Sequence, residues 1–432
     1  MSMAAPKRWF DDRRSAAFLV FACALIVRCL WLTVPIEVPA QDTPDYDEIA
    51  LNLVSGQGFV SHDNWFGHPM RSWRAPLYPA LLASVYGLWG YHHWIVQVLQ
   101  AFVGACTAVG VLILARRLHP PSGLVVGLIV ALYPSLITMS AQIMTETLFA
   151  ALLVAALVVA TGSRFTATGS GLLVGLATLT RPVGLLLAPA LVLPRLWSAW
   201  QHRDGRAWLA SIRRSAWMLV GLVLVLSPWT IRNGLVHDAF VPVSTHGGFI
   251  LAGSNAHQPQ WRQADGWQIQ PDVFAQMPNE VERDRYWRSQ AWTWIAAHPL
   301  AWLRLVGERF LRFWYVFRPD FNVGFMLWVP LILVGAVRFG STPAYREITV
   351  FSALSVLVFS TLLYGSTRFR LPMEPLFLLY VGPVLSTAWA SARRRMWIAA
   401  GVVWAVVNLM VWWKQEIVRG WVLEILYAGG LK

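Results

Sequence analysis

Long apolar runs separated by short basic segments dominate the chain. The first run, Ser15 to Val34, has about the 20 residues that a membrane-spanning helix needs, and it follows a basic N-terminal stretch. No A-x-A cleavage pattern follows it, so we expect a retained helix rather than a signal peptide. Ten further runs bring the predicted spans to about eleven: 95–115, 122–138, 144–162, 168–181, 183–194, 215–231, 324–337, 348–365, 373–391 and 396–413.

Two long polar segments, about 35–94 and 232–323, interrupt these runs. In the first, residues 45–54 predict a short helix, and residues 76–90 predict an apolar helix that is too short to span and is expected in the membrane interface. In the second, residues 282–318 carry aromatic and apolar side chains at helical spacing, which predicts an amphipathic helix along the membrane surface. The pattern therefore predicts an all-α polytopic membrane protein with interfacial helices in its outer loops.

Composition supports a membrane protein and explains the charge. Charged residues make up 13% of the chain and hydrophobic residues 56%, whereas about a quarter of a soluble domain is charged. With the N-terminus in the cytoplasm, the short arginine-rich loops all fall on the cytoplasmic side, and together with the N-terminal stretch they carry the whole net charge of +13. The excess is thus a topology signal, and nucleic acid is not expected as a partner. We expect one transmembrane domain over residues 1–432, with no separate soluble C-terminal domain.

Five acids crowd the outer end of the first span. A solvated acidic loop would explain several of them, and Thr43 or Asp45 is placed to cap the following helix. However, Tyr46, Ala50 and residues 53–54 form an apolar stripe that would dock this segment on the membrane. Docking would draw at least one acid into a partly dehydrated cleft, where its pKa rises toward a value useful for a general base. The acids are Glu37, Asp42, Asp45, Asp47 and Glu48.

Ionisable residues also lie in or beside the spans, where they are costly and usually face a cavity. Arg28, Glu146 and Arg181 either neutralise one another or line such a cavity. Arg368 and Arg370 sit just outside a predicted span and either snorkel to lipid headgroups or converge on an outer-face cavity that suits a phosphate with a lipid tail.

Cofactor signals are few. The three cysteines lie in apolar runs, the ten histidines form no metal-ligand spacing, and no glycine motif has the strand–turn–helix context of a nucleotide site. No cofactor is therefore predicted with certainty. A divalent metal stays open, because Asp45, Asp47 and Glu146 can supply oxygen ligands although no spacing demands it.

Several short motifs follow one another in order along the chain. The first outer loop carries Asp42-Thr-Pro-Asp-Tyr46, Gly56-x-Gly58-Phe59 and Arg74-x-Pro76-x-Tyr78-Pro79. Further matches are Thr145-Glu146-Thr147-Leu148-Phe149, Thr180-Arg181-Pro182, Pro228-Trp229-Thr-Ile-Arg232-Asn233, Gly247-Gly248 with Gly253-Ser-Asn255, His298-Pro299 and Arg368-Phe-Arg370-Leu-Pro372-x-Glu374-Pro375. Together these motifs resemble a known family, the lipid-sugar-dependent glycosyltransferases of the GT-C superfold (glycosyltransferase family 39, with protein O-mannosyltransferases and the lipid A aminoarabinose transferase). The resemblance implies a GT-C type helical bundle with a cavity at the outer leaflet.

The resemblance also implies an activity: transfer of a sugar from a polyprenyl (undecaprenyl-type) phosphate donor to an acceptor hydroxyl, at the periplasmic face of a bacterial inner membrane. An aspartate of the first outer loop is catalytic in that family, and Asp42 takes its place here, with Asp45, Asp47 and Glu146 as supporting acids. We expect the donor phosphate to bind arginines and the sugar or acceptor to lie in a pocket. The arginines are Arg370, Arg368 and Arg181, and the pocket residues are Tyr46, Arg74, Tyr78, His246 and Asn255.

The acceptor is a lipid, a glycan or a protein, and two other functions stay open. One is a glycan polymerase or ligase that uses a diphosphate-linked donor. The other is a non-enzymatic transporter of the lipid carrier, although repeated halves typical of transporters are not evident. Because the acidic first loop is followed by the Arg74-x-Pro76-x-Tyr78-Pro79 run, the sequence favours the monophosphate-dependent transferase.

Overall fold

The computed structural model describes residues 13–34, 42–62, 68–161, 167–255, 279–316 and 324–414, with the single positions 277, 322, 417 and 420. Over these residues the chain is predominantly helical, and β-structure is limited to one isolated antiparallel bridge between Ser61 and Met70. The predicted all-α fold is confirmed. Glu37 of the predicted acidic group lies outside the described residues.

Most helices begin and end close to the predicted boundaries, but α9 ends seven residues beyond the predicted span 183–194 and α10 begins ten residues before the predicted span 215–231. In chain order they are α1 (Arg13–Leu32), α2 (Thr43–Val54), α3 (Leu77–Trp89), α4 (His93–Leu118), α5 (Gly123–Ala131), α6 (Pro134–Ser140), α7 (Glu146–Thr161), α8 (Ala167–Thr180), α9 (Leu187–Gln201), α10 (Gly205–His237), α11 (Gly247–Asn255), α14 (Glu280–Ala297), α15 (Pro299–Trp314), α17 (Phe325–Phe339), α18 (Arg346–Thr361), α19 (Thr367–Arg370), α20 (Glu374–Phe377), α21 (Val381–Ala390) and α22 (Arg394–Trp413). Short 3₁₀ turns, Pro120–Ser122, Pro182–Leu186, Leu371–Met373 and Leu378–Tyr380, continue several of them.

Six helical segments of the described chain are long and apolar enough to cross a membrane, and a bent pair, α5 with α6, makes a seventh. The six are Arg13–Leu32, His93–Leu118, Pro182–Gln201, Gly205–His237, Thr367–Ala390 and Arg394–Val411. The predicted spans at 144–162, 168–181 and 324–337 form shorter apolar helices, α7, α8 and α17. The chain is thus a polytopic membrane protein, as predicted, but by length and composition the described residues show six or seven spans where about eleven are predicted.

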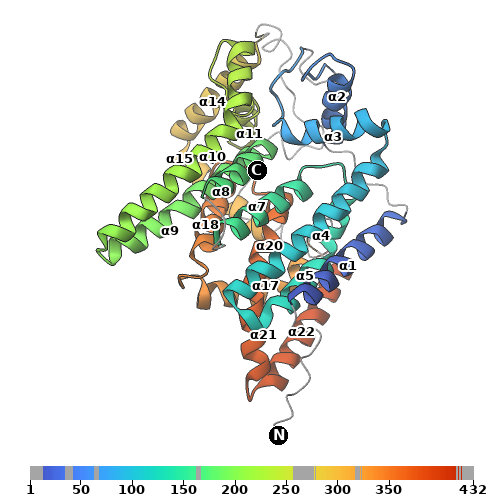
Figure 1. Ribbon diagram of the computed structural model, residues 1–432, viewed down its shortest axis with the longest axis vertical. Helices are drawn as coiled ribbons and strands as arrows, with labels where there is room; N and C mark the ends of the chain where they lie inside the picture. The colour runs from blue at the N-terminus through green and yellow to red at the C-terminus, as the bar shows by residue number, and fades with distance from the viewer. Residues whose placement is uncertain are drawn as a thin grey trace.

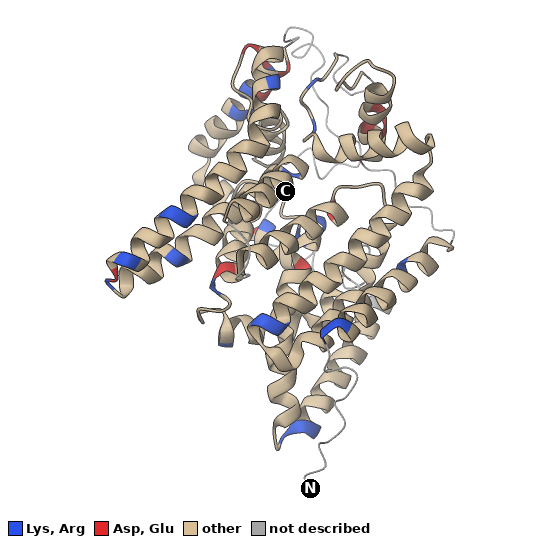
Figure 2. Cartoon of the chain, in the orientation of Figure 1, with Lys and Arg blue, Asp and Glu red and all other residues tan. Residues whose placement is uncertain are grey.

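The two long polar segments meet at one end of the molecule. In Figure 1, α2 and α3 of the first segment and α14 of the second lie at the upper end, whereas the turn between α21 and α22 lies at the lower end. Figure 2 shows Lys and Arg at the corner where α9 meets α10 and at the start of α22, with long uncharged stretches of helix between. This separation matches a bundle whose two ends face different aqueous compartments.

The predicted span 122–138 is bent by 50° where α5 ends and α6 begins. Pro134 opens α6 and lacks the N–H group that would continue α5. Arg28, fully buried in α1, donates from Nη1 to the carbonyl of Ala131 at 2.9 Å and to that of Ala24 at 3.0 Å. It lies against Gly104, where a Cβ atom would stand 2.6 Å from Arg28 Nε. Arg28 therefore binds the carbonyl end of α5, where the span is bent, instead of pairing with Glu146.

Small residues let α8 and α10 touch backbone to backbone. A Cβ atom on Gly171 would lie 1.9 Å from Met218 O, and one on Gly221 would lie 2.2 Å from Thr168 O. Such close approach is typical of helix pairs inside membranes, where packing takes the place of the hydrophobic effect. The contact fixes the position of α8, and so of Arg181 just beyond its end.

Helix α2 docks on α3 through Tyr46 and Ala50 of the predicted apolar stripe, whereas the stripe was expected to dock on the membrane and Val54 at its end is exposed. Tyr46 and Ala50 are buried with Tyr78 and Leu82 of α3. The chain turns back after α2 through Gly56 and Gly58, whose φ angles of 80° and 86° favour glycine.

The amphipathic stretch predicted over residues 282–318 forms two helices, α14 and α15, instead of one. The break falls at Pro299, which begins α15 and cannot donate the hydrogen bond that would extend α14. Trp287 and Ala291 of α14 are buried in a cluster with Trp73 and Phe249. The first polar segment is thereby attached to the second.

A polar network ties the same segments to the end of α10. Ser72 Oγ donates to Asn233 Oδ1 at 2.8 Å and lies 2.8 Å from His237 Nε2. Arg232 Nη1 donates to Arg71 O at 2.7 Å, and His237 Nε2 lies 2.8 Å from a carboxylate oxygen of Glu280. The loop before Arg74 is thus held on two sides.

Candidate active site

Asp42 stands immediately before α2, at the position where a helix-capping residue is expected. Its side chain makes no capping hydrogen bond, and Pro44 follows in the first turn, where the missing N–H costs nothing. Thr43, one of the two predicted caps, donates to Ile143 O at 3.1 Å. The carboxylate of Asp42 is therefore available for side-chain partners.

Three carboxylates and three guanidiniums alternate along one line of ion pairs, which we call the acid–arginine chain. Its members, in order of contact, are Asp45, Arg74, Asp42, Arg368, Glu146 and Arg181. They come from the start of α2, the loop before α3, the start of α7, the residue after α8, and α19. Segments separated by more than 300 positions in the sequence thus form one site.

Asp42 is at the middle of this chain and uses both carboxylate oxygens. Its Oδ1 lies 3.0 Å from Arg74 Nη2, and its Oδ2 lies 2.6 Å from Arg368 Nη2. Arg74 Nη2 also lies 2.5 Å from Asp45 Oδ2. Two guanidiniums therefore converge on one carboxylate, an arrangement that equally suits a phosphate.

Glu146 joins Arg368 to Arg181 at the other end of the acid–arginine chain. Its Oε1 atom lies 2.6 Å from Arg368 Nε and 2.8 Å from Arg181 Nη1. The side chain of Glu146 is 1% exposed, while those of Asp42 and Asp45 are each 26% exposed. The predicted neutralisation of Arg181 by Glu146 is thus present, and the accessible end of the chain is the one that carries Asp42.

The charges around Asp42 set its protonation. Burial alone would raise the pKa of its carboxyl group, but the positive charges of Arg74 and Arg368 outweigh burial and hold that pKa well below its ordinary range. Arg74 is partly desolvated, which would lower its pKa, yet Asp42 and Asp45 raise it above the ordinary arginine value. Asp42 is therefore ionised, and paired, in this structure.

Aromatic rings frame the chain. Arg74 lies over the ring of Tyr46 at 5.3 Å, and Tyr46 packs edge-on against Tyr78 with ring centres 5.2 Å apart. Arg181 lies 5.4 Å from the ring centre of Phe369. Tyr78 is fully buried and donates to Gln100 Oε1 at 2.8 Å. Of the two predicted pocket tyrosines, Tyr46 contacts the site and Tyr78 supports it from behind.

His246 lies close to the Asp42–Arg74 pair. Its ring centre lies 4.1 Å from that of Trp73, with the two rings tilted by 44°, and it stacks on Phe249 at 5.5 Å. Burial and the charge of Arg74 lower the pKa of His246 well below its ordinary value, against the opposing effect of Asp42. The imidazole is therefore neutral and can hydrogen-bond a polar ligand without adding charge.

Three predicted site residues have other partners. Asp47 accepts from Tyr86 at 2.6 Å and from Tyr91 at 3.1 Å, and lies 2.7 Å from His93 Nε2. This cluster lies on another face of α2, so Asp47 does not join Asp42 in the acid–arginine chain.

Asn255, predicted to line the sugar pocket, is fully buried. It donates to Leu251 O at 2.7 Å and accepts from Arg309 Nη2 at 2.9 Å. Arg309 Nη1 also donates to Thr361 O at 2.7 Å. Asn255 therefore joins α11 to α15 and α18 rather than pointing into an open pocket.

Arg370, predicted to bind the donor phosphate, is enclosed by protein. Its side chain and that of Glu374 are 0% exposed, with Arg370 Nε 2.8 Å from Glu374 Oε1. Its two terminal nitrogens donate to Phe313 O and Asn322 Oδ1, and its guanidinium lies 3.7 Å from the ring centre of Phe325. Because protein groups surround this guanidinium, we assign Arg370 a structural role, and Arg368 is the arginine of this motif that meets Asp42.

The acids proposed as possible metal ligands have other partners in the described residues. Within the described ranges, no three His, Cys, Asp or Glu side chains gather where they could hold a metal ion. Asp42, Asp45 and Glu146 each face an arginine instead.

Sequence reasoning missed some of the residues that organise the site. Glu280 accepts from the backbone N–H of Arg71 at 3.1 Å, a contact across 209 positions for which no local signal exists. Thr145 accepts from Arg181 Nη1 at 3.2 Å, and its place in the Thr145-Glu146-Thr147 motif is a sequence signal that could have identified it.

Comparisons with known proteins agree with the fold. Residues 68–231 match the family model for dolichyl-phosphate-mannose-protein mannosyltransferase. No curated protein matches the chain closely enough to count as a relative. Among solved structures, ArnT from Cupriavidus metallidurans bound to undecaprenyl phosphate is 16% identical with a TM-score of 0.55, over 92% of this chain and 64% of that one.

The oligosaccharyltransferase of Archaeoglobus fulgidus, in a complex with Zn and sulfate, is 13% identical with a TM-score of 0.58, over 91% of this chain and 51% of that one. The chain therefore spans between about half and two thirds of the length of these neighbours. The chain therefore shares the helical fold of these GT-C neighbours, and the family model agrees with the resemblance seen in the sequence over residues 68–231.

Proposed function

We propose that this protein transfers a sugar from a polyprenyl-phosphate donor to an acceptor hydroxyl at the outer face of a bacterial inner membrane. Asp42 is the general base, and the arginines beside it bind the donor phosphate. The observation that carries the proposal is the convergence of Arg74 and Arg368 on the partly exposed carboxylate of Asp42. The ArnT neighbour bound to undecaprenyl phosphate supports a lipid phosphate as the ligand.

The donor phosphate and Asp42 compete for the same guanidiniums. A phosphodiester that enters beside Arg74 and Arg368 takes over N–H donors that the carboxylate of Asp42 now occupies. As the phosphate shares their positive charge, the pKa of Asp42 returns toward its ordinary range. The carboxylate then becomes basic enough to accept a proton from an acceptor hydroxyl.

The transfer itself follows from this geometry. The acceptor oxygen attacks the anomeric carbon as its proton passes to Asp42, and the bond from that carbon to the phosphate oxygen breaks with inversion. The leaving phosphate keeps the bonding electrons, and the arginines stabilise its charge, so that no strong general acid is required. Glu146 holds Arg368 and Arg181 in place, and Tyr46 and His246 flank the sugar or acceptor.

The test is transfer from a labelled polyprenyl-phosphate sugar by purified protein in detergent. We expect Asp42→Asn to lose activity by about a hundredfold to ten-thousandfold, the usual range for a missing general base. Asp47→Asn is the matched control, since it removes an acid of the same helix outside the acid–arginine chain. Substantial transfer by Asp42→Asn would exclude the proposed base.

The same assay separates the two alternatives. Turnover in detergent needs no second compartment, so a transporter of the lipid carrier would show none. A polymerase or ligase would require the diphosphate-linked donor and leave the monophosphate donor intact.

A further inference from the structure

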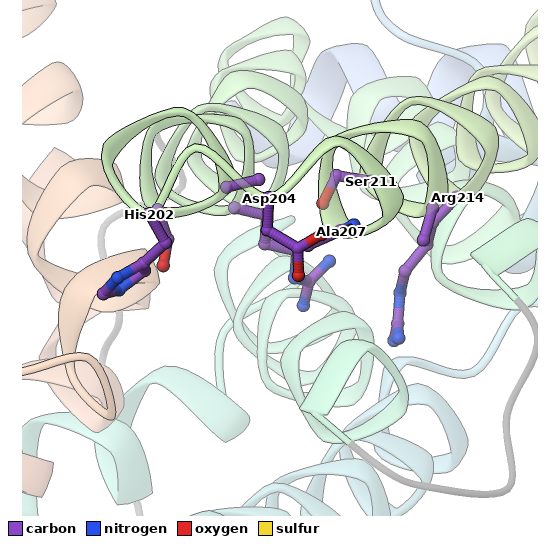
Figure 3. A pocket seen from close by; sticks show the side chains of 9 residues that line it. His202, Asp204, Ala207, Ser211 and Arg214 are labelled. Carbon is purple, nitrogen blue, oxygen red and sulfur yellow. Dashed lines mark hydrogen bonds between the residues drawn. The ribbon is translucent and has the colours of Figure 1, made fainter.

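A cavity of about 540 Å³ lies at the corner where α9 turns into α10, and none of its lining residues belongs to the candidate active site. Residues of the last turn of α9, the connecting turn and the first turns of α10 line it, among them Arg195, Ser198, His202, Asp204, Ser211 and Arg214. In Figure 3 the side chains of His202, Asp204 and Arg214 extend to the same side of the ribbon. The lining thus combines two arginines and two serines with a histidine, one acid and three alanines.

Two arginines are fixed toward one point of this cavity. Arg195 Nη2 and Arg214 Nη2 donate to the same oxygen, Ala160 O, at 3.1 Å and 2.8 Å. A guanidinium has five N–H donors, and these bonds use one on each side chain. Glu347 lies 3.5 Å from Arg195 Nε, a loose pair. Two guanidiniums held side by side make a preformed anion site.

The one acid that lines the cavity is engaged elsewhere. Asp204 Oδ1 accepts from the backbone N–H groups of Arg206 and Ala207 at 2.9 Å and 3.1 Å, as the N-cap of α10. Five arginines and this single acid occupy residues 195–214. The local charge is therefore positive and only weakly balanced.

The surroundings of the cavity favour a membrane lipid over a free phosphate as its anionic ligand. Both helices that meet at this corner are long enough and apolar enough to span a membrane, so their connecting turn lies at a membrane surface. Trp197 and Trp200 beside the turn are 53% and 62% exposed, with ring centres 5.0 Å apart, as in the aromatic belts of membrane proteins. Exposed Leu193 and Leu209 extend the apolar surface. A free phosphate would need none of these apolar groups.

We infer that this cavity binds the anionic headgroup of a membrane phospholipid, with the phosphate between Arg195 and Arg214 and the acyl chains along α9 and α10. Basic pockets between helices at a membrane surface are suited to such headgroups. A volume of about 540 Å³ is far more than one phosphate needs and accommodates a phosphoglycerol group. The inference does not depend on the proposed transferase activity.

The experiment measures binding of phosphatidylglycerol to the full chain in phosphatidylcholine nanodiscs, by native mass spectrometry. We expect the double variant Arg195→Gln, Arg214→Gln to bind about tenfold more weakly than the unaltered protein. The control, Arg203→Gln with Arg213→Gln, removes two arginines of the same segment that do not line the cavity, and should change binding by less than about twofold. Equal losses would show a general surface attraction and overturn the inference.

A second variant guards against misfolding of the first. Ala207→Phe fills the cavity while leaving both arginines and their bonds to Ala160 in place. We expect it to lose phosphatidylglycerol binding to the same extent with an unchanged circular dichroism spectrum. Retained binding would overturn the inference, as would stabilisation by inorganic phosphate alone in phosphatidylcholine nanodiscs, because the site would then be one for a soluble anion.

Discussion

Two arginines separated by one residue, Arg368 and Arg370, form ion pairs of opposite character. Arg370 and Glu374 are completely buried, and protein groups enclose the Arg370 guanidinium. Arg368 and Asp42 are partly exposed, at 14% and 26%, and belong to a chain in which each charge is shared between neighbours. The enclosed pair can only hold the fold together, whereas the shared one can exchange a carboxylate for another anion. Accessibility, rather than the presence of an arginine, separates a structural site from a binding site.

The largest effect is expected where the enclosed pair is broken. Glu374→Gln leaves the buried charge of Arg370 without its counter-ion, which should lower the free energy of unfolding by about 3–5 kcal/mol. Asp45→Asn, at the exposed end of the acid–arginine chain, should change it by less than about 1 kcal/mol. Thermal unfolding in detergent compares the two, and similar values would remove the distinction between enclosed and shared pairs.

Donor binding should show the reverse order. Arg368→Gln removes a charged hydrogen-bond donor from the proposed phosphate site, so we expect affinity for polyprenyl phosphate to fall by about tenfold to a hundredfold. Arg370→Gln, assayed on its folded fraction, should leave that affinity within about twofold. Titration with polyprenyl phosphate in detergent measures both affinities. A larger loss of affinity for Arg370→Gln than for Arg368→Gln would show that Arg370 binds the phosphate.

Competition between Asp42 and phosphate predicts a gain of binding. Asp42→Asn frees Arg74 and Arg368 of a negative partner, so polyprenyl phosphate should bind about fivefold to tenfold more tightly, although transfer is lost. Asp47→Asn should bind as the unaltered protein does. Weaker lipid binding by Asp42→Asn would contradict competition even if its transfer activity is absent.

The smallest effect is a dependence of stability on pH. Because the pKa of Asp42 is lower in the folded protein than in the unfolded chain, its ion pairs stabilise the fold fully above about pH 4, the unfolded value. That stabilisation, about 1 kcal/mol, is lost as the pH falls from there toward the folded pKa. The free energy of unfolding, measured from pH 7 to pH 3, should therefore fall more steeply for the unaltered protein than for Asp42→Asn. Parallel curves would show that the ion pairs of Asp42 contribute nothing to stability.

Much of the fold was predictable because apolar runs of membrane length have few alternatives. The helix α2, its docking through Tyr46 and Ala50, and the position of Asp42 before it all follow from local pattern. Helical periodicity also separates Asp47 from Asp42 and Asp45, since residues three apart share a face and residues five apart do not. The five-residue separation of Asp47 from Asp42 is therefore a sequence signal that Asp47 lies outside the site.

Other features depend on tertiary packing that no local pattern contains. Arg368 and Arg370 sit in the same four-residue helix, α19, and only the packing of α7, α15 and α20 around it decides which one is enclosed. The role of Arg74, predicted only as a pocket residue, likewise depends on how its loop is held by Ser72 and Glu280. The break at Pro299 is the exception, because the proline is visible in the sequence.

The hydrogen bond between Arg28 and the end of α5 has a consequence for synthesis of the chain. Arg28 leaves the ribosome 103 residues before Ala131, whose carbonyl it binds in the finished protein. After α1 is inserted and before α5 is made, we expect the Arg28 side chain to extend toward the lipid headgroups from near the end of its helix. A charged arginine side chain in the hydrocarbon core would cost free energy. The arrival of the bent α5–α6 pair then draws the side chain inward, so α1 reaches its final orientation only after a quarter or more of the chain has been inserted.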